Sequence, residues 1–243
     1  MATKFGNRYD EQTRTGGGGN DVRPETIRAE CDKSLGRLGV ETIGIYQLHD
    51  GANSVGQAEE VVATCEELVA AGKIRAFGCA QDTPEVVEVF ARSEGCVAVQ
   101  TQVNVFGWTA ASLEAARAAG LGVLARSPLA MGLLAGKYDA AHRPGSGDVR
   151  MNAPWWDYFD DEAMPGWLGR IESVRELLTA DGRTLVQGAL GYLLGLDPAL
   201  VPLPGVRTEA QATENAAVLT LGPLPAETTA EITALMADSP ERR

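Results

Sequence analysis

His49 is the residue of this sequence whose type and position point most directly to chemistry. It follows the apolar run at residues 42–48 (TIGIYQL) and precedes Asp50. An imidazole at the end of a buried strand can donate a hydrogen bond to a bound carbonyl group, or it can be a structural histidine. Polar residues at the carboxyl ends of parallel strands often line catalytic sites, which favours the first interpretation. His142 lies in a polar loop and is interpreted as structural.

Other polar side chains occupy similar positions. Lys4 lies in ATKFG, Gln81 follows GCA, and Gln100 alternates with apolar residues in VAVQTQVN. Because a glutamine in a buried strand needs hydrogen-bond partners, a ligand amide would suit Gln100. Gly205 and Arg207 follow the last apolar run and precede a helix, an arrangement that can bind a phosphate. With two histidines and no HExxH motif, the sequence predicts no histidine-rich metal site.

Two kinds of apolar segment alternate along the chain and would position these residues. Short runs that are apolar on both faces predict strands buried in a parallel sheet. They are residues 42–48, 74–79, 97–103, 121–125 and 200–204, with a short further strand at residues 1–4. Segments with helical spacing lie between them, several opened by proline or closed by glycine. They are residues 24–38, 57–71, a helix beginning at 83–85, 110–119, 168–178, 184–194, 208–219 and 226–236.

This alternation predicts an α/β protein built from βα repeats, for which two architectures compete. A doubly wound sheet usually carries a glycine-rich nucleotide fingerprint after its first strand. The cluster at residues 16–19 lies in a polar stretch and matches neither GxGxxG nor the P-loop pattern, so we expect a flexible loop there. The polar residues at the strand ends favour a (β/α)8 barrel.

Residues 137–167 form a long segment rich in proline and glycine that carries three of the four tryptophans. Loops of this length in a compact domain are usually lids or binding loops. The alternative is a solvent-exposed loop that is anchored to the domain by its aromatic side chains. The barrel order would put this loop at the same end as His49. We therefore expect it to lie near the active site of a single domain over residues 1–243.

Composition excludes several classes of function. The 243 residues carry a net charge of −12, which argues against a nucleic-acid partner and against an anionic membrane surface. No apolar signal core opens the chain and no run of 18 apolar residues occurs, so we expect a cytoplasmic protein. The four cysteines form no CxxC pair and predict isolated, reduced thiols.

Taken together, the chain resembles the aldo-keto reductases, in particular their bacterial branch. The blocks that carry the similarity are ATKFGNRYDEQTR, PETIR, SLGRLGVETIGIYQLHD, ELVAAGKIRAFGCA, VQTQVNVF, RSPLAMGLLAGKY, DVRMNAPWWDYF, GRTLVQGALGYLL and PGVRTEAQATEN. The resemblance implies a (β/α)8 barrel that transfers hydride from NADPH to a small aldehyde or ketone. It places Lys4 on the lysine that lowers the pKa of a tyrosine general acid, and His49 on the histidine that orients the carbonyl.

The resemblance also implies the residues that hold the cofactor. Gln100, with Ala80 and Gln81 in place of the family's Ser-Asn pair, falls on the positions that bind the nicotinamide carboxamide, and Arg126 falls where a ring often stacks. The remaining positions face the phosphates and adenine: Ser127, Leu129, Gly132, Gly205, Arg207, Gln211, Glu214 and Asn215. Because Gly205 and Gln211 stand where basic residues are common, Arg207 is the remaining candidate for a 2′-phosphate. NADP(H) is favoured, with NAD(H) as the alternative.

The family's DTAxxYG motif, which carries the catalytic Asp and Tyr, does not occur in these residues. The resemblance therefore implies a barrel lacking about the first two βα units, because the sequence starts inside the third strand. Such a chain would be weakly active alone, and its open sheet edges would favour homo-oligomers. The alternative is a non-catalytic nucleotide-binding or regulatory protein on a reductase scaffold.

Overall fold

The computed structural model describes residues 1–10, 12–13, 15–52, 54–139, 141–151, 153 and 156–241. The chain divides into two compact units, of which unit 1 comprises Met1–Thr101 and Ala110–Leu124, and unit 2 comprises Gln102–Thr109 and Ala125–Arg243. Within the similarity blocks and the long loop, Glu11, Arg14, Ala140, Asn152, Pro154 and Trp155 lie outside the described residues.

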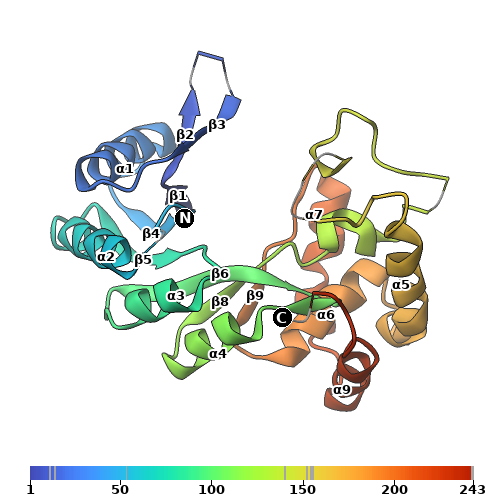
Figure 1. Ribbon diagram of the computed structural model, residues 1–243. Helices are drawn as coiled ribbons and strands as arrows, with labels where there is room; N and C mark the ends of the chain where they lie inside the picture. The colour runs from blue at the N-terminus through green and yellow to red at the C-terminus, as the bar shows by residue number, and fades with distance from the viewer. Residues whose placement is uncertain are drawn as a thin grey trace. The chain divides into compact units, whose positions relative to one another are not determined.

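Unit 1 is built on parallel strands. Strands β1 (Ala2–Phe5), β4 (Ile43–Leu48), β5 (Ile74–Cys79) and β6 (Cys96–Asn104) pair in that order, and each pair is parallel (Figure 1). In the register of β1 and β4, Lys4 is opposite Gln47 and Phe5 is opposite Leu48. The full strand order is β1-β4-β5-β6-β8-β9, where β8 is Gly122–Arg126 and β9 is Leu200–Pro202. The strands predicted from the apolar runs are thus confirmed to within a few residues.

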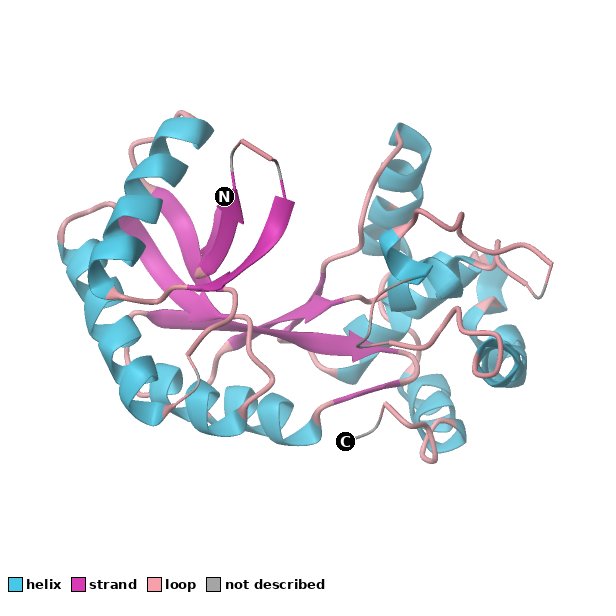
Figure 2. Ribbon diagram, turned by 45° about the horizontal axis from the view of Figure 1, so that its top comes forward, coloured by secondary structure: helices cyan, strands magenta, loops and turns pink. Residues whose placement is uncertain are grey.

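Four helices cover one face of the unit 1 strands (Figure 2). They are α1 (Pro24–Leu38), α2 (Val55–Ala70), α3 (Pro84–Ala91) and α4 (Ala110–Ala118). Local signals explain the bounds of α1, since Pro24 opens the first turn and Gly39 ends the helix in a left-handed conformation, with φ of 65°. Its apolar face buries Ile27 and Cys31 completely.

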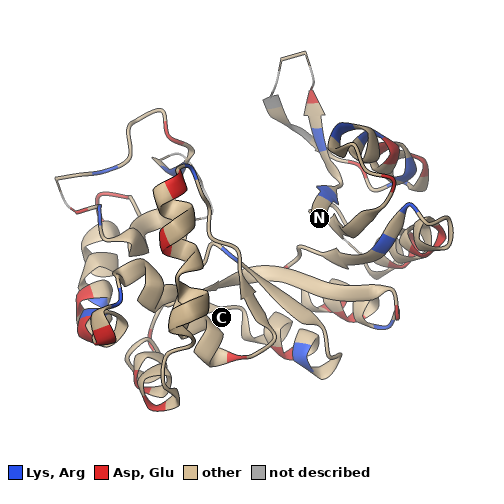
Figure 3. Cartoon of the chain, turned by 180° about the vertical axis from the view of Figure 1, so that it is seen from behind, with Lys and Arg blue, Asp and Glu red and all other residues tan. Residues whose placement is uncertain are grey.

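Aromatic pairs fill the core between the strands and helices of unit 1. Phe5 stacks on Tyr46 with ring centroids 4.4 Å apart, and Phe77 meets Phe90 edge to face at 6.0 Å. The charged residues lie mainly on the helices, the loops and the exposed strand β2, whereas the parallel strands carry few of them (Figure 3). This division is what strands buried on both faces require.

The glycine cluster at residues 16–19 is not a flexible loop, and that prediction was wrong. Thr15–Asn20 is strand β3, which pairs antiparallel with β2 (Asn7–Asp10), with Asn7 opposite Asn20 and Tyr9 opposite Gly16. Backbone groups make the ladder between two strands, so a run of glycines can join it without any apolar side chain. The pattern of side chains therefore gave no signal.

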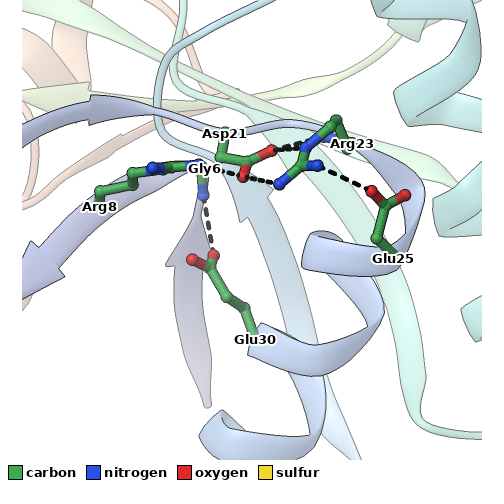
Figure 4. Close-up of polar contacts among 6 residues, drawn as sticks. All are labelled: Gly6, Arg8, Asp21, Arg23, Glu25 and Glu30. Carbon is green, nitrogen blue, oxygen red and sulfur yellow. Dashed lines mark hydrogen bonds and ion pairs between the residues drawn. The ribbon is translucent and has the colours of Figure 1, made fainter.

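Asp21, at the end of this hairpin, holds a cluster of charges together (Figure 4). Its carboxylate accepts hydrogen bonds from Arg23 Nε at 2.9 Å, Arg23 Nη2 at 2.7 Å and Arg8 Nη2 at 2.7 Å. The side chain of Asp21 is only 5% exposed. Hydrogen bonds from Arg23 and then Arg8 hold the pKa of Asp21 well below its usual range.

We expect Asp21→Asn to lower the free energy of unfolding at pH 7 by about 2 kcal/mol, the scale of lost hydrogen bonds to a charged group. A depressed folded-state pKa gives stability that is present above the unfolded-state pKa of about 3.9 and lost as the pH falls below it. The difference between wild type and variant should therefore shrink between pH 5 and pH 2. Urea unfolding at several pH values measures this. Asp32→Asn, which removes the exposed Asp32–Lys73 ion pair, is the control and should change stability by less than about 0.5 kcal/mol.

Unit 2 is mostly helical. Its helices are α5 (Met164–Leu178), α6 (Leu185–Leu196), α7 (Glu209–Ala216), α8 (Val218–Leu221) and α9 (Ala226–Leu235), with 3-10 turns η1 (Ala130–Ala135), η2 (Val149–Met151) and η3 (Ala180–Gly182) and the short strand β7 (Gly107–Trp108). The N–H of Leu203, just after β9, donates to Ala125 O in β8 at 3.0 Å. The single helix predicted over residues 208–219 is interrupted at Ala217, and α5 begins four residues before the predicted start at 168, inside the predicted loop.

A close approach fixes how α5 and α6 pack. Gly188 of α6 lies against the last turn of α5, where a Cβ on Gly188 would be 1.9 Å from Leu178 O. The start of α6 is a capping box in which the Thr184 and Gln187 side chains each accept from the other's backbone N–H. Arg183 just before it donates to Leu221 O at 2.8 Å and Gly222 O at 3.0 Å, which ties α6 to the end of α8.

The four cysteines are free, as predicted, and all are buried. Burial raises the pKa of Cys31, Cys65 and Cys79, and it raises the pKa of Cys96 to about 11. No helix among the described residues is long and apolar enough to cross a membrane.

Because the thiolate is the reactive form of cysteine, we expect the folded chain to be almost inert towards Ellman's reagent at pH 8. After unfolding in guanidinium chloride, all four thiols should react. Absorbance of the released thionitrobenzoate measures both states. Rapid labelling of the folded chain would contradict the burial of the thiols.

Candidate functional site

Lys4 and His49 line one cavity of unit 1, with a volume of about 810 Å³. Both lie at the carboxyl ends of neighbouring parallel strands, since Lys4 is in β1 and His49 directly follows β4. The backbone N–H of His49 donates to Phe5 O at 2.8 Å, which fixes the end of β4 against β1. Both residues that the family resemblance assigns to catalysis therefore line the same cavity.

A hydrogen bond from Asn7 indicates which ring nitrogen of His49 carries the proton. The side-chain amide nitrogen of Asn7 lies 2.9 Å from His49 Nδ1. Asn20, in the orientation that satisfies its neighbours, donates to Asn7 Oδ1 at 3.2 Å, which supports the assignment of the Asn7 amide. An amide nitrogen can only donate, so Nδ1 is the acceptor and the proton of the neutral ring is on Nε2.

Two buried glutamines of unit 1 have side-chain atoms without a hydrogen-bond partner among the described residues. Gln100 Oε1 is one of them, in a side chain that is 4% exposed, and Gln47 Nε2 is the other. Gln47 was missed in the sequence, although it is a glutamine within the mostly apolar run TIGIYQL. Gln81 is also buried, and its Nε2 lies 3.5 Å from Asp50 Oδ1, while Ala80 N–H donates to Leu48 O.

Unit 2 contains a pocket of about 630 Å³, referred to below as the unit 2 pocket. Its lining comes from the turn after β8, from the long loop and from the segment between β9 and α7. The lining residues are Ser127, Pro128, Leu129, Met131, Gly132, Ala135, Lys137, Asp148, Val149, Arg150, Val186, Leu203, Gly205, Val206, Arg207, Gln211, Glu214 and Asn215. All of the residues that the sequence assigned to the phosphates and adenine are in this set.

The wall formed by the turn after β8 has an uncommon backbone. Ser127, Ala130 and Met131 have φ values of 53°, 46° and 55°, in the left-handed region. For residues other than glycine this costs about 1–2 kcal/mol each, and such strain persists where the surroundings hold it. Leu129 packs beneath the turn against Val186 of α6 and its buried neighbours. The turn, referred to below as the left-handed turn, comprises residues 127–132.

Another part of the pocket wall is the start of α7. Thr208 caps this helix, its hydroxyl accepting from Gln211 N–H, and Gln211 Oε1 accepts from Arg207 N–H at 2.8 Å. The family resemblance predicts that Gln211 lies near the phosphate. In the structure its side chain also holds the backbone N–H of Arg207. Asn215 is 9% exposed, and its Nδ2 has no partner among the described residues. A buried, unpartnered amide in a pocket wall is a group that a ligand acceptor would satisfy.

The long loop contributes an ion pair that sequence reasoning missed. Asp148 and Arg150 pair at 2.6 Å beside the pocket, and their side chains are 23% and 15% exposed. Hydrogen bonds from Arg150 hold the pKa of Asp148 well below its usual range, and the charge of Arg207 lowers it further. Acidic and basic residues two positions apart in a polar loop carry no distinctive signal, so only the fold reveals the pair.

The other predicted cofactor residues do not line this pocket. Arg126 precedes the left-handed turn, and Ala80, Gln81 and Gln100 belong to unit 1. Among the described residues there is also no cluster of three His, Cys, Asp or Glu side chains that could hold a metal ion.

Comparison with known proteins identifies the family. The sequence model of the Aldo/keto reductase family matches residues 1–237. The chain belongs to this family. The fold agrees: the chain superposes over its full length on 73% of a glycerol dehydrogenase from Gluconobacter oxydans, with a TM-score of 0.84 and 27% identity. An α/β fold of the aldo-keto reductase barrel type is therefore confirmed.

Relatives of this aldo-keto reductase include proteins whose names carry NADP(+) and NADH. It is 27% identical over 220 residues to yakc, an aldo-keto reductase of Schizosaccharomyces pombe whose name carries NADP(+). It is 29% identical over 205 residues to an NADH-specific methylglyoxal reductase of Escherichia coli. The matches cover 88% and 83% of this chain, and the chain spans 63% and 61% of these two relatives.

Proposed function

We propose that this aldo-keto reductase is an NADP(H)-linked oxidoreductase that reduces small aldehydes or ketones. The observation that carries the proposal is the unit 2 pocket, where Asn215 offers a buried, unpartnered amide and Arg207 lies at the start of α7. A helix N-terminus with an adjacent arginine is suited to an anionic phosphate. The names of the relatives, which include NADP(+) and NADH proteins, support a nicotinamide cofactor.

The residues present fit such a cofactor. In the unit 2 pocket, Asn215 and Glu214 would hold the adenine, Arg207 the 2′-phosphate, and the left-handed turn the pyrophosphate. The family resemblance assigns the nicotinamide carboxamide to Gln100 and Gln81, and Gln100 Oε1 is a buried acceptor without a partner among the described residues. When bound, the cofactor supplies hydride to the carbonyl carbon.

The chain's own residues act on the carbonyl group. His49 falls on the histidine that orients the carbonyl in the family; its imidazole would donate a hydrogen bond to the carbonyl oxygen and so stabilise the charge that develops there. Lys4, in the same cavity, is the cation that would lower the pKa of a general acid, as it does in the family. The DTAxxYG motif that supplies this acid in the family is not in the 243 residues.

We therefore expect the 243-residue chain to bind NADPH but to reduce carbonyl compounds slowly. Loss of a general acid typically lowers the rate by about 10²–10⁴-fold. Carbonyl-dependent oxidation of NADPH, followed at 340 nm with a panel of small aldehydes and ketones, measures this. The comparison is a chain extended at its N-terminus by a segment that carries DTAxxYG, which should be active.

The outcomes distinguish a reductase from a non-catalytic nucleotide-binding protein with the same fold. Activity of the extended chain that His49→Ala abolishes would support the reductase. Nucleotide binding without activity in either form would favour the non-catalytic binding protein. Robust turnover by the 243-residue chain alone would contradict the assignment of the general acid to that motif.

A further inference from the structure

The charge of Arg150 is satisfied by its neighbour in the long loop. Its Nε donates to Asp148 Oδ1 at 2.8 Å and its Nη2 donates to Asp148 Oδ2 at 2.6 Å. This two-pronged pairing uses the planar fork of the guanidinium and fixes the plane of the group. Although Arg150 lines the unit 2 pocket, its positive charge is already paired with a carboxylate.

The rest of the guanidinium is directed at the left-handed turn. Arg150 Nη1 donates to Met131 O at 3.2 Å, and a Cβ on Gly132 would lie 3.4 Å from the same nitrogen. The guanidinium carbon lies 5.3 Å from the ring centre of Tyr138 and 5.8 Å from that of Phe159. Two aromatic rings and one carboxylate therefore hold Arg150 against the backbone of Met131 and Gly132.

Those two residues need such support. Met131 has φ of 55° and Gly132 has φ of 93°, and the residue before them, Ala130, is also left-handed. Leu133 and Leu134 are fully buried and anchor the turn on its inner side. Arg150 supplies a contact to its other side, where the turn borders the pocket. A strained backbone keeps its conformation only where several surrounding contacts stabilise it.

We propose that Arg150 is a positioning residue that holds the left-handed turn in the shape that binds the pyrophosphate of the cofactor. The inference rests on the proposed function, because it assigns the pyrophosphate to this turn. Arg150 acts through Met131 and Gly132 rather than as a phosphate ligand. Its effect is therefore common to every nicotinamide dinucleotide, whether or not a 2′-phosphate is present.

The experiment measures binding of NADPH and NADH to the 243-residue chain by nucleotide fluorescence. Arg150→Gln should weaken both by about tenfold, as expected for loss of one charge-assisted hydrogen bond. Arg150→Lys keeps the charge but cannot form the fork with Asp148 and also reach Met131, so it should lose as much as Arg150→Gln. Circular dichroism at the titration temperature verifies that each variant is folded.

Arg143→Gln is the matched control. Arg143 lies in the same loop, pairs with Asp161 and donates to Phe159 O at 3.1 Å, yet it does not line the pocket. Its replacement should leave both affinities unchanged, and a loss equal to that of Arg150→Gln would show general damage to the loop and overturn the inference.

Three further results would overturn it. A loss of affinity confined to NADPH would show that Arg150 is a ligand of the 2′-phosphate. Wild-type affinity in Arg150→Lys would show that a positive charge at this position is sufficient for nucleotide binding. Wild-type affinity in Arg150→Gln would show that the turn does not depend on Arg150. These results require that the wild-type chain binds nucleotide. If the wild type binds neither NADPH nor NADH, the proposed function itself is contradicted.

Discussion

Arg207→Ala is expected to weaken NADPH binding by roughly ten- to a hundredfold and to leave NADH binding nearly unchanged. The two nucleotides differ only in the 2′-phosphate, so a selective loss identifies a contact to that group. A guanidinium at the start of a helix adds charge-assisted hydrogen bonds to the field of the helix, on the order of 1.5–3 kcal/mol. Nucleotide fluorescence titrations at fixed ionic strength measure both affinities.

The structure supports this expectation in two ways. Gln211 Oε1 holds the backbone N–H of Arg207 at 2.8 Å, so the residue is anchored while its side chain borders the pocket. The other arginine that lines the pocket, Arg150, already donates two hydrogen bonds to Asp148. Arg207 also acts on Asp148, because its charge contributes to lowering the pKa of that carboxyl.

The selectivity is the decisive part of this experiment. Equal loss for NADPH and NADH would show that Arg207 supports the fold of the pocket and that a 2′-phosphate is held elsewhere. Arg207→Lys is the conservative variant and should retain part of the preference, because lysine keeps the charge but not the fork. Raised salt should narrow the gap between the two nucleotides in the wild type.

The sequence predicted those parts of the fold that local signals determine. Helix α1 begins at Pro24 and ends before Gly39, as expected, because proline and glycine act within one turn of the helix. Strand β3 was missed because antiparallel pairing between Asn7 and Asn20 is a non-local property of the backbone. The break at Ala217 was missed because neither proline nor glycine marks it.

The same division holds for the candidate site. His49 was predicted from its position after a buried strand, whereas the roles proposed for Asn215 and Glu214 came only from the family resemblance. The role proposed for Arg150 could not be predicted from the sequence, because it depends on a contact with Met131, 19 positions earlier in the chain. A residue that acts by holding another segment is visible only once both segments are placed.

Gly188→Ala is expected to destabilise the chain by on the order of 3 kcal/mol or more. The new Cβ would lie 1.9 Å from Leu178 O and 2.6 Å from Leu178 C. These are backbone atoms at the end of α5, so no side chain can rotate away. Relief requires α5 and α6 to separate, which would open the buried contacts between them.

Gly169→Ala is the matched control for this prediction. Gly169 lies within α5, and a Cβ there would meet no atom within 4 Å. Alanine has the higher helix propensity, so this variant should gain about 0.5–1 kcal/mol. Urea unfolding followed by circular dichroism gives both free energies of unfolding, and a Gly188→Ala variant as stable as wild type would show that α5 and α6 are not packed this closely. Because α6 also supports the left-handed turn through Val186, the destabilised variant should bind nucleotide less tightly as well.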